Sequence, residues 1–169
     1  MKDLPNRQSI RLRNYDYSSE GAYFVTICTQ NREMLFGDIV NGIMVLNDIG
    51  KIVEFVWESL PQHYKVELGP FQIMPNHIHM IIMIVGAGFS RPITLGNIIA
   101  YFKYQSTKQI NTNIMGSENP TPTDIKYPKA FQRNYFEHVI RNEKDFDKIS
   151  WYIENNPQMW DEDENNITG

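Results

Sequence analysis

Two of the four histidines in the 169-residue chain occupy alternate positions of an apolar segment, the run Met-Pro-Asn-His-Ile-His-Met-Ile-Ile at 74–82. Side chains two positions apart on a β-strand project from the same face. His77 and His79 are therefore expected to point together, while Ile78 enters a core on the other face. Two imidazoles about 6 to 7 Å apart along a strand can hold one metal ion between them. The alternative is a pair of half-buried histidines satisfied by backbone groups or water.

A second group of reactive side chains lies on a predicted helix near the C-terminus, between a capping Asn142 and Pro157, which forbids continuation. Helical spacing leaves Tyr152 and Asn156 as an i, i+4 pair beside an apolar stripe of Phe146, Ile149 and Ile153. If this face packs toward the histidine strand, Asn156 can supply a third ligand oxygen and Tyr152 can approach a substrate bound to the same ion. The plainer interpretation places Tyr152 at the core margin and makes Asn156 a C-terminal cap.

The elements that must position these groups alternate between strand and helix patterns. Strands are predicted at 22–29, 66–73, 77–85 and 130–140, a hairpin at 36–46 turning at Asn41-Gly42, and helices from 47 or 48 to about 60 and from 94 to about 110. Pro61 is expected to end the first helix. Lys103 is expected on the exposed side of the second helix, and 111–128 is expected to form a mobile loop over a site.

Composition indicates one domain spanning residues 1–169, because the length fits a single domain and 41% hydrophobic residues suffice for one core. The single cysteine, Cys28, excludes an intramolecular disulfide and is expected to be a small core residue. No apolar run is long enough to cross a bilayer, so we expect a cytoplasmic protein with no membrane partner.

Charge is distributed unevenly along a chain whose net charge is −4. Four consecutive carboxylates at 161–164 open an acidic tail at 161–169, and without them the remainder is neutral. Residues 1–20 form a basic and aromatic arm in which Arg7, Arg11 and Arg13 are predicted to contact nucleic acid; the alternative is a solvated arm. Lys103 is predicted as a further DNA contact.

Several motifs together resemble one family. The Met-Pro-Asn-His-Ile-His-Met run is similar to the HUH motif (His, bulky apolar, His), and Tyr152 followed by Asn156 and Pro157 resembles the tyrosine motif of REP-associated tyrosine transposases. These enzymes are relatives of the small single-tyrosine insertion-sequence transposases. The segments 11–17, 21–29 and 130–141 extend the resemblance across almost the whole chain.

The resemblance implies an α+β, ferredoxin-like antiparallel sheet with helices packed on it. It also implies that His77, His79 and Asn156 hold a divalent ion and that Tyr152 attacks single-stranded or hairpin DNA, leaving a covalent 5′-phosphotyrosine. Two imidazoles and a neutral carboxamide suit Mg²⁺ or Mn²⁺ with water positions left open for phosphate. We expect a monomer or homodimer.

Two other functions fit the same residues. The first is a domesticated module that binds a nucleic-acid hairpin without cutting it. The second is a metal-dependent hydrolase of small phosphoesters, in which His77 and His79 hold the metal and water is the nucleophile.

Overall fold

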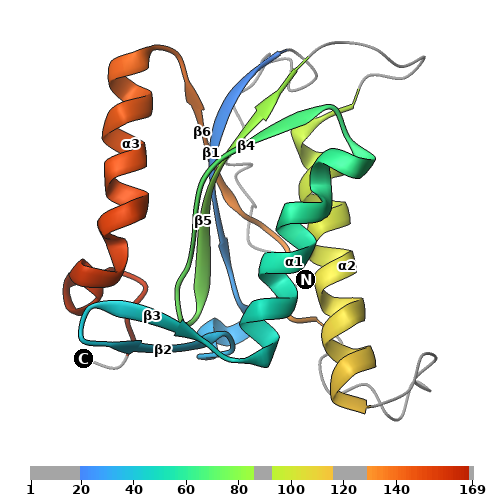
Figure 1. Cartoon of the computed structure of the whole chain (residues 1–169), viewed down its shortest axis with the longest axis vertical. Helices are drawn as coiled ribbons and strands as arrows, with labels where there is room; N and C mark the ends of the chain where they lie inside the picture. Colours follow the sequence, from blue (N-terminus) through green and yellow to red (C-terminus); the bar gives the residue numbers. More distant parts are fainter. Residues whose placement is uncertain (1–19, 86–92, 116–128, 168–169) are drawn as a thin grey trace, which may run out of the picture.

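The computed structural model describes residues 20–85, 93–115 and 129–167. Its centre is an antiparallel sheet of order β4-β5-β1-β6, formed by β1 (Gly21–Cys28), β4 (Val66–Ile73), β5 (His77–Ile84) and β6 (Phe136–Ile140). Helices α1 (Asp48–His63) and α2 (Leu95–Met115) cover one face, and α3 (Glu143–Asn155) covers the other (Figure 1). The succession β1-α1-β4-β5-α2-β6 is the βαββαβ pattern of ferredoxin-like proteins, so the predicted α+β fold is confirmed.

Two smaller features are added to this frame. A hairpin of β2 (Gly37–Val40) and β3 (Ile43–Leu46) lies between β1 and α1, and it turns at Asn41 and Gly42 as predicted, with φ of 53° and 73°. Two short 3-10 helices, η1 (Gln30–Arg32) and η2 (Asn156–Glu162), follow β1 and α3.

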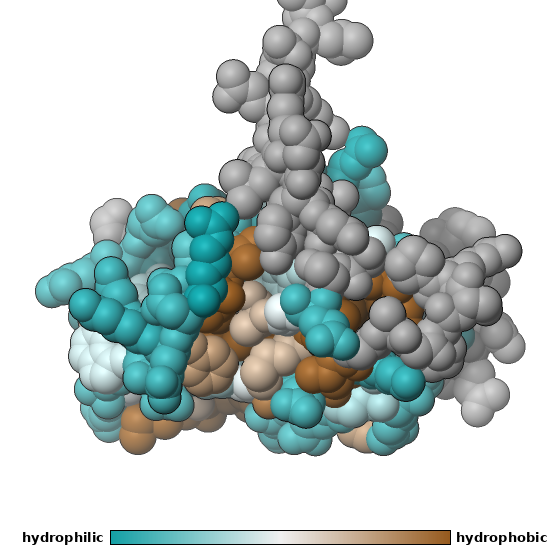
Figure 2. Space-filling view, turned by 90° about the horizontal axis from the view of Figure 1, so that it is seen from above, coloured by the Kyte–Doolittle hydropathy of each residue, from teal (hydrophilic) through white to brown (hydrophobic). Residues whose placement is uncertain are grey.

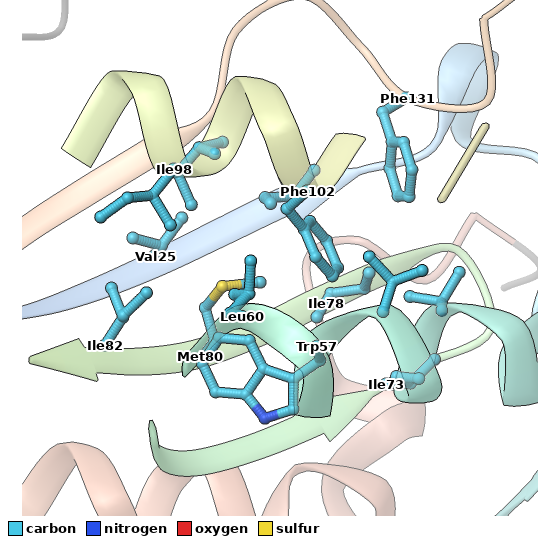
Figure 3. Packing of buried hydrophobic residues seen from close by; sticks show 14 of the residues in the cluster. Val25, Trp57, Leu60, Ile73, Ile78, Met80, Ile82, Ile98, Phe102 and Phe131 are labelled. Carbon is cyan, nitrogen blue, oxygen red and sulfur yellow. The ribbon is translucent and has the colours of Figure 1, made fainter. Parts of the chain in front are cut away.

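The main core lies between the sheet and helices α1 and α2. In Figure 3, Val25, Ile78, Met80 and Ile82 from the central strands face side chains of the two helices, namely Leu60, Trp57, Ile98 and Phe102. Ile78 is fully buried there, so its predicted inward orientation is confirmed. On the face seen from above, hydrophobic residues are visible near the middle, and hydrophilic residues cover much of the left-hand side (Figure 2).

A second, smaller core lies under α3. Ile153 packs with Ile81 of β5 and Ile140 of β6, and the partly buried Phe146 and Ile149 extend the contact, which confirms the predicted apolar stripe. Strand β5 is consequently covered on both faces, and this explains why its sequence is apolar at nearly every position.

Two predicted helix ends are wrong. Helix α1 continues through Pro61 to His63, since a proline this near the end interrupts only the last turn. Helix α2 continues past Ile110 to Met115, and Asn111 and Asn113 donate side-chain hydrogen bonds there to the carbonyl oxygens four residues earlier. The first five residues of the predicted mobile loop at 111–128 are therefore helical, and residues 116–128 lie outside the described residues.

The end of the chain also differs from expectation. Strand β6 begins only at Phe136, and the predicted strand 130–135 is irregular apart from one bridge between Phe131 and Thr29. After α3, Pro157 starts a 3-10 helix rather than stopping the structure, so that part of the acidic tail folds back onto the protein. Within the described part of the chain, no helix has the length and apolarity needed to cross a membrane.

Candidate active site

The two histidines of β5 meet on the α3 side of the sheet. Their Nε2 atoms lie 3.0 Å apart, and both side chains are almost fully buried. Their placement follows from the alternation of β5, which sends His77 and His79 to one face and Ile78 to the other. The predicted convergence of the two imidazoles is therefore observed.

Neighbouring side chains fix how the imidazoles present their lone pairs. Asn76 donates its Nδ2 hydrogens to the carbonyl oxygens of Asn165 (2.8 Å) and Arg32 (3.4 Å), so its Oδ1 faces His77 Nδ1 at 2.9 Å. Because a carboxamide oxygen only accepts, His77 Nδ1 carries the proton and Nε2 carries a lone pair. His79 Nδ1 lies 2.8 Å from the hydroxyl of Thr26, its partner across the β1–β5 ladder.

This arrangement suits a cation. Without one, the 3.0 Å contact requires a proton on His79 Nε2. With one, His79 Nδ1 would donate to Thr26, and the Nε2 lone pairs of His77 and His79 would both be available as ligands. Ligand atoms about 2.1 Å from an octahedral ion lie about 3 Å apart at neighbouring vertices, close to the observed separation.

Asn156, the first residue of η2, and Asp163, which directly follows η2, supply oxygen atoms to the cluster. Asp163 has a side chain only 2% exposed, with Oδ2 3.8 Å from His77 Nε2, and the ligand atoms of His77, His79 and Asp163 all lie within 4.8 Å of one another. Asn156 donates to Asp163 Oδ2 at 3.0 Å, while its own buried Oδ1 has no hydrogen-bond partner among the described residues. An orphaned buried oxygen is what an absent cation would leave. The residues present therefore fit a divalent ion.

Burial keeps the cluster in the charge state that metal binding requires. Desolvation lowers the pKa of His77 to about 4, and desolvation together with the neighbouring His77 lowers the pKa of His79 to about 3. Burial alone would raise the pKa of Asp163, but hydrogen bonds from Asn165 and Asn156 and the proximity of His77 outweigh it, so the pKa is lowered. At neutral pH both imidazoles are neutral and Asp163 is ionised, the forms that act as ligands.

Tyr152 projects from α3 toward this cluster. Its hydroxyl lies 3.4 Å from His79 Nε2, and its ring packs edge-on against His79 and Phe24. Burial, together with the charges of Asp163 and Glu164, raises its pKa, which a hydrogen bond from Asn156 partly offsets. The structure thus brings Tyr152, Asn156 and the two histidines together, and the phenol stays protonated at neutral pH.

A cavity of about 420 Å³ opens beside Tyr152. Its walls come from β1, η1, the 132–136 segment and the end of the chain, and the lining residues are Phe24, Thr26, Cys28, Arg32, His79, Gln132, Asn134, Tyr135, Phe136, Tyr152, Glu164 and Asn165. Cys28 is only partly buried and faces this cavity rather than the main core, which corrects its expected role. Burial raises the pKa of its thiol, with smaller effects from nearby charges.

Of the residues predicted to contact DNA, Lys103 alone lies within the described part of the chain. The Lys103 ammonium is half-buried rather than exposed, and it donates to the carbonyl oxygens of Gln132, Arg133 and Asn134 at 2.9, 3.3 and 3.2 Å. Burial lowers the pKa of Lys103 to about 8. Its contact with DNA stays a prediction. Arg7, Arg11 and Arg13 lie outside the described residues.

Three residues of the cluster are not predicted as site residues from the sequence. The charge pattern groups Asp163 with an acidic tail, although in the structure Asp163 directly follows the 3-10 helix that includes Pro157. Asn76 is predicted only as part of the turn before β5. Thr26 can be found from the alternation of β1, where a polar hydroxyl interrupts a strand on the face opposite Val25 and Ile27.

Fold and site together define a protein with a ferredoxin-like sheet, a histidine pair on a central strand and a tyrosine facing that pair from a helix. The family model for IS200-like transposases matches residues 18–156. The chain belongs to the IS200-like transposase family.

Two relatives match most of the chain. An uncharacterised protein of Haemophilus influenzae is 40% identical over 179 residues, covering 95% of this chain and 93% of that protein. A second Haemophilus influenzae protein, provisionally named a REP-associated tyrosine transposase, is 28% identical over 148 residues, covering 86% and 76%. The resemblance to REP-associated tyrosine transposases is confirmed.

Solved structures share the fold. A REP-associated tyrosine transposase bound to a REP hairpin aligns with a TM-score of 0.58 at 19% identity, covering 89% of this chain and 73% of that one. A protein of Deinococcus radiodurans, provisionally named a transposase, aligns with a TM-score of 0.50 at 15% identity, covering 86% and 95%.

Proposed function

We propose that this protein is a metal-dependent single-stranded DNA endonuclease and strand transferase that forms a covalent 5′-phosphotyrosine intermediate. The observation that carries the proposal is the 3.4 Å separation between the Tyr152 hydroxyl and the Nε2 atom of His79, which itself faces His77 Nε2. A nucleophile thereby lies against a cluster suited to a divalent cation, and a phosphate bound there would be within its reach.

Each side chain of the cluster has a distinct part. His77, His79 and Asn156 would hold Mg²⁺ or Mn²⁺, with Asp163 as a further oxygen ligand. Asn76 and Thr26 orient the two imidazoles from behind, as second partners of metal-bound histidines generally do. When bound, the ion supplies Lewis-acid stabilisation of charge on the non-bridging phosphate oxygens.

The covalent step is balanced within these residues and the DNA. The Tyr152 oxygen forms a bond to phosphorus as the bond from phosphorus to the 3′ oxygen breaks. The phenol loses one proton and the departing 3′ oxygen gains one. The products are therefore a 5′-phosphotyrosine and a free 3′-OH. Because the phosphodiester energy is retained in the tyrosine ester, a second 3′-OH can reverse the step and join strands.

The substrate class follows from the family and from a relative. The REP-associated transposase of similar fold is bound to a REP hairpin. We infer that this chain likewise acts on single strands at hairpin-forming repeats. Arg7, Arg11, Arg13 and Lys103 are proposed to contribute to DNA binding.

The test is covalent attachment to DNA. Purified protein is incubated with Mn²⁺ and end-labelled single-stranded hairpins carrying randomised flanks, and the products are separated on a denaturing gel. We expect a protein–DNA adduct and a free 3′-OH fragment. Tyr152→Phe should form neither, since only the hydroxyl is removed, while Tyr104→Phe, a tyrosine of α2 that is 62% exposed, should react normally.

Two outcomes discriminate among the functions. An adduct formed by Tyr152→Phe would show that another residue is the nucleophile. Hairpin binding without any adduct would favour the non-catalytic module, and release of phosphate from small esters without an adduct would favour the hydrolase. Asn156→Ala should raise the Mn²⁺ concentration needed for cleavage, because a ligand oxygen is removed.

A further inference from the structure

The cavity beside Tyr152 has one aromatic wall. Phe24 and Phe136 meet edge-to-face with ring centroids 6.1 Å apart, and Phe24 also stacks on His79 at 5.6 Å. Phe136 is 48% exposed although it is a large apolar side chain at an active-site opening. An exposed ring at this place offers a flat apolar surface to a planar ligand.

The cavity lining also carries hydrogen-bonding groups. Gln132 and Asn134 line the cavity, and within the described ranges neither side-chain carboxamide has a hydrogen-bond partner. A carboxamide offers one acceptor and two donor hydrogens, the combination that pairs with the edges of nucleobases. The wall is therefore able to discriminate between bases.

Lys103 holds this polar wall in place. The segment 132–134 is joined to β1 by one backbone hydrogen bond, from Gln132 N to the carbonyl oxygen of Cys28 at 3.0 Å. Its three carbonyl oxygens all accept from the Lys103 ammonium. The same ammonium lies 5.2 Å from the centroid of the Tyr135 ring. Because Lys103 holds the backbone of this segment, the side chains of Gln132 and Asn134 lose little further conformational freedom when a ligand binds.

We propose that this cavity binds one unpaired nucleobase of a nucleotide that flanks the scissile phosphate. The base stacks on the exposed ring of Phe136, with Phe24 bordering it edge-on, and its edge is read by Gln132 and Asn134. The volume of about 420 Å³ lies within the range of small-molecule sites and accommodates a base with its sugar. Stacking on aromatic side chains combined with edge recognition is how proteins read splayed single-stranded bases.

The place of the cavity sets which nucleotide it takes. Tyr152 and His79 line the same space, so a base seated on Phe136 has its own phosphate near the Tyr152 hydroxyl. The proposal rests on the proposed function for its choice of DNA as ligand. It adds a subsite that selects the sequence at the cut.

The test measures binding rather than cleavage, so that its failure differs from a failure of the proposed chemistry. Tyr152→Phe protein selects from a library of single-stranded hairpins with randomised flanks, and the bound DNA is sequenced. We expect a base preference at one unpaired position. Adding Gln132→Ala or Asn134→Ala should remove the preference at that position while leaving the others unchanged.

A double-variant comparison then assigns the position to the cavity. Replacing the preferred nucleotide by an abasic one should weaken binding about 5- to 150-fold, the cost of removing one stacked base. The same replacement should have little further effect in Phe136→Ala protein. Phe55→Ala is the matched control, because Phe55 lies on α1 across the sheet and is 62% exposed, and it should behave as the parent does.

Two results would overturn the subsite. One is a loss of affinity on abasic replacement that is the same in Phe136→Ala as in the parent protein at every unpaired position. The other is a base preference that survives both carboxamide substitutions. Absence of any covalent adduct in wild-type protein, with the binding pattern intact, would instead contradict the proposed strand cleavage and leave the subsite standing.

Discussion

Acid should destabilise the metal-free protein through its buried histidines. An unfolded histidine takes up a proton as the pH falls below about 6.5, whereas His77 in the folded protein does so only near its pKa of about 4. Between these values the unfolded state binds more protons, so the free energy of unfolding falls as the pH falls. Over about 2.5 pH units, at about 1.4 kcal/mol per unit, His77 alone accounts for about 3 kcal/mol.

Protonation of His79 also lowers the free energy of unfolding as the pH falls, because its pKa in the folded protein is lowered to about 3. The two imidazoles interact, so their protons are not taken up independently and the combined slope lies between about 1.4 and 2.7 kcal/mol per pH unit. Asp163 contributes little to this window. Its pKa is lowered from 3.8, so the stability it supplies disappears only at more acid pH.

The assay is urea unfolding followed by tryptophan fluorescence between pH 4.5 and 7 in the presence of a chelator. We expect the free energy of unfolding of His77→Gln to depend less steeply on pH than that of the wild type, by up to about 1.4 kcal/mol per pH unit. This difference in slope does not depend on the stability of the variant at pH 7. Equal slopes for the two proteins would show that His77 titrates as it does in the unfolded chain. The buried, neutral histidine pair described for β5 would then be incorrect.

Further expectations concern the core, the groups around the ligands and the arm. Ile78→Ala should lower the free energy of unfolding by about 2 to 5 kcal/mol in urea titrations, because a fully buried side chain leaves a cavity; a decrease below about 1 kcal/mol would contradict that burial. Asn76→Ala should weaken Mn²⁺ binding about 10- to 100-fold by calorimetry, and unchanged affinity would remove its role in fixing the His77 tautomer. Lys103→Met should destabilise by about 1 to 3 kcal/mol in urea, since the carbonyl oxygens of 132–134 lose their hydrogen bonds from a charged donor; wild-type stability would mean that the 132–134 segment is held otherwise. Deleting residues 1–13 should weaken hairpin binding and reduce its salt dependence by about one unit of slope for each phosphate that the arm neutralises, whereas unchanged binding at low and high salt would favour a solvated arm.

Local periodicity is sufficient to predict the centre of the site. Alternation along β5 separates His77 and His79 from Ile78, and helical spacing places Tyr152 and Asn156 on one face of α3. Each inference needs only the geometry of its own element. The two faces meet because the apolar stripe of α3 has a single uncovered sheet face left to pack on, the one opposite α1 and α2.

Long-range and irregular features cannot be predicted in this way. Thr26 reaches His79 only because β1 and β5 pair in one particular register. Asp163 enters the cluster because the chain continues in a 3-10 helix after Pro157, where propensity indicates a stop. Lys103 is expected to face solvent because nothing in its helix indicates the carbonyl oxygens of 132–134 that surround it. These contacts depend on backbone paths that local patterns do not encode.

The uneven division of the core has a consequence for how activity disappears on heating. Helix α3 carries Tyr152 but is held by a cluster of only three buried side chains, Ile81, Ile140 and Ile153, while the sheet and the other two helices share a far larger one. Segments with few buried apolar contacts open at lower free energy than the rest of a protein. Tyr152, the proposed nucleophile, therefore lies on the helix that separates most easily from the sheet. Mild heating should raise amide hydrogen exchange in α3 and abolish strand cleavage while the histidine pair on β5 is still folded.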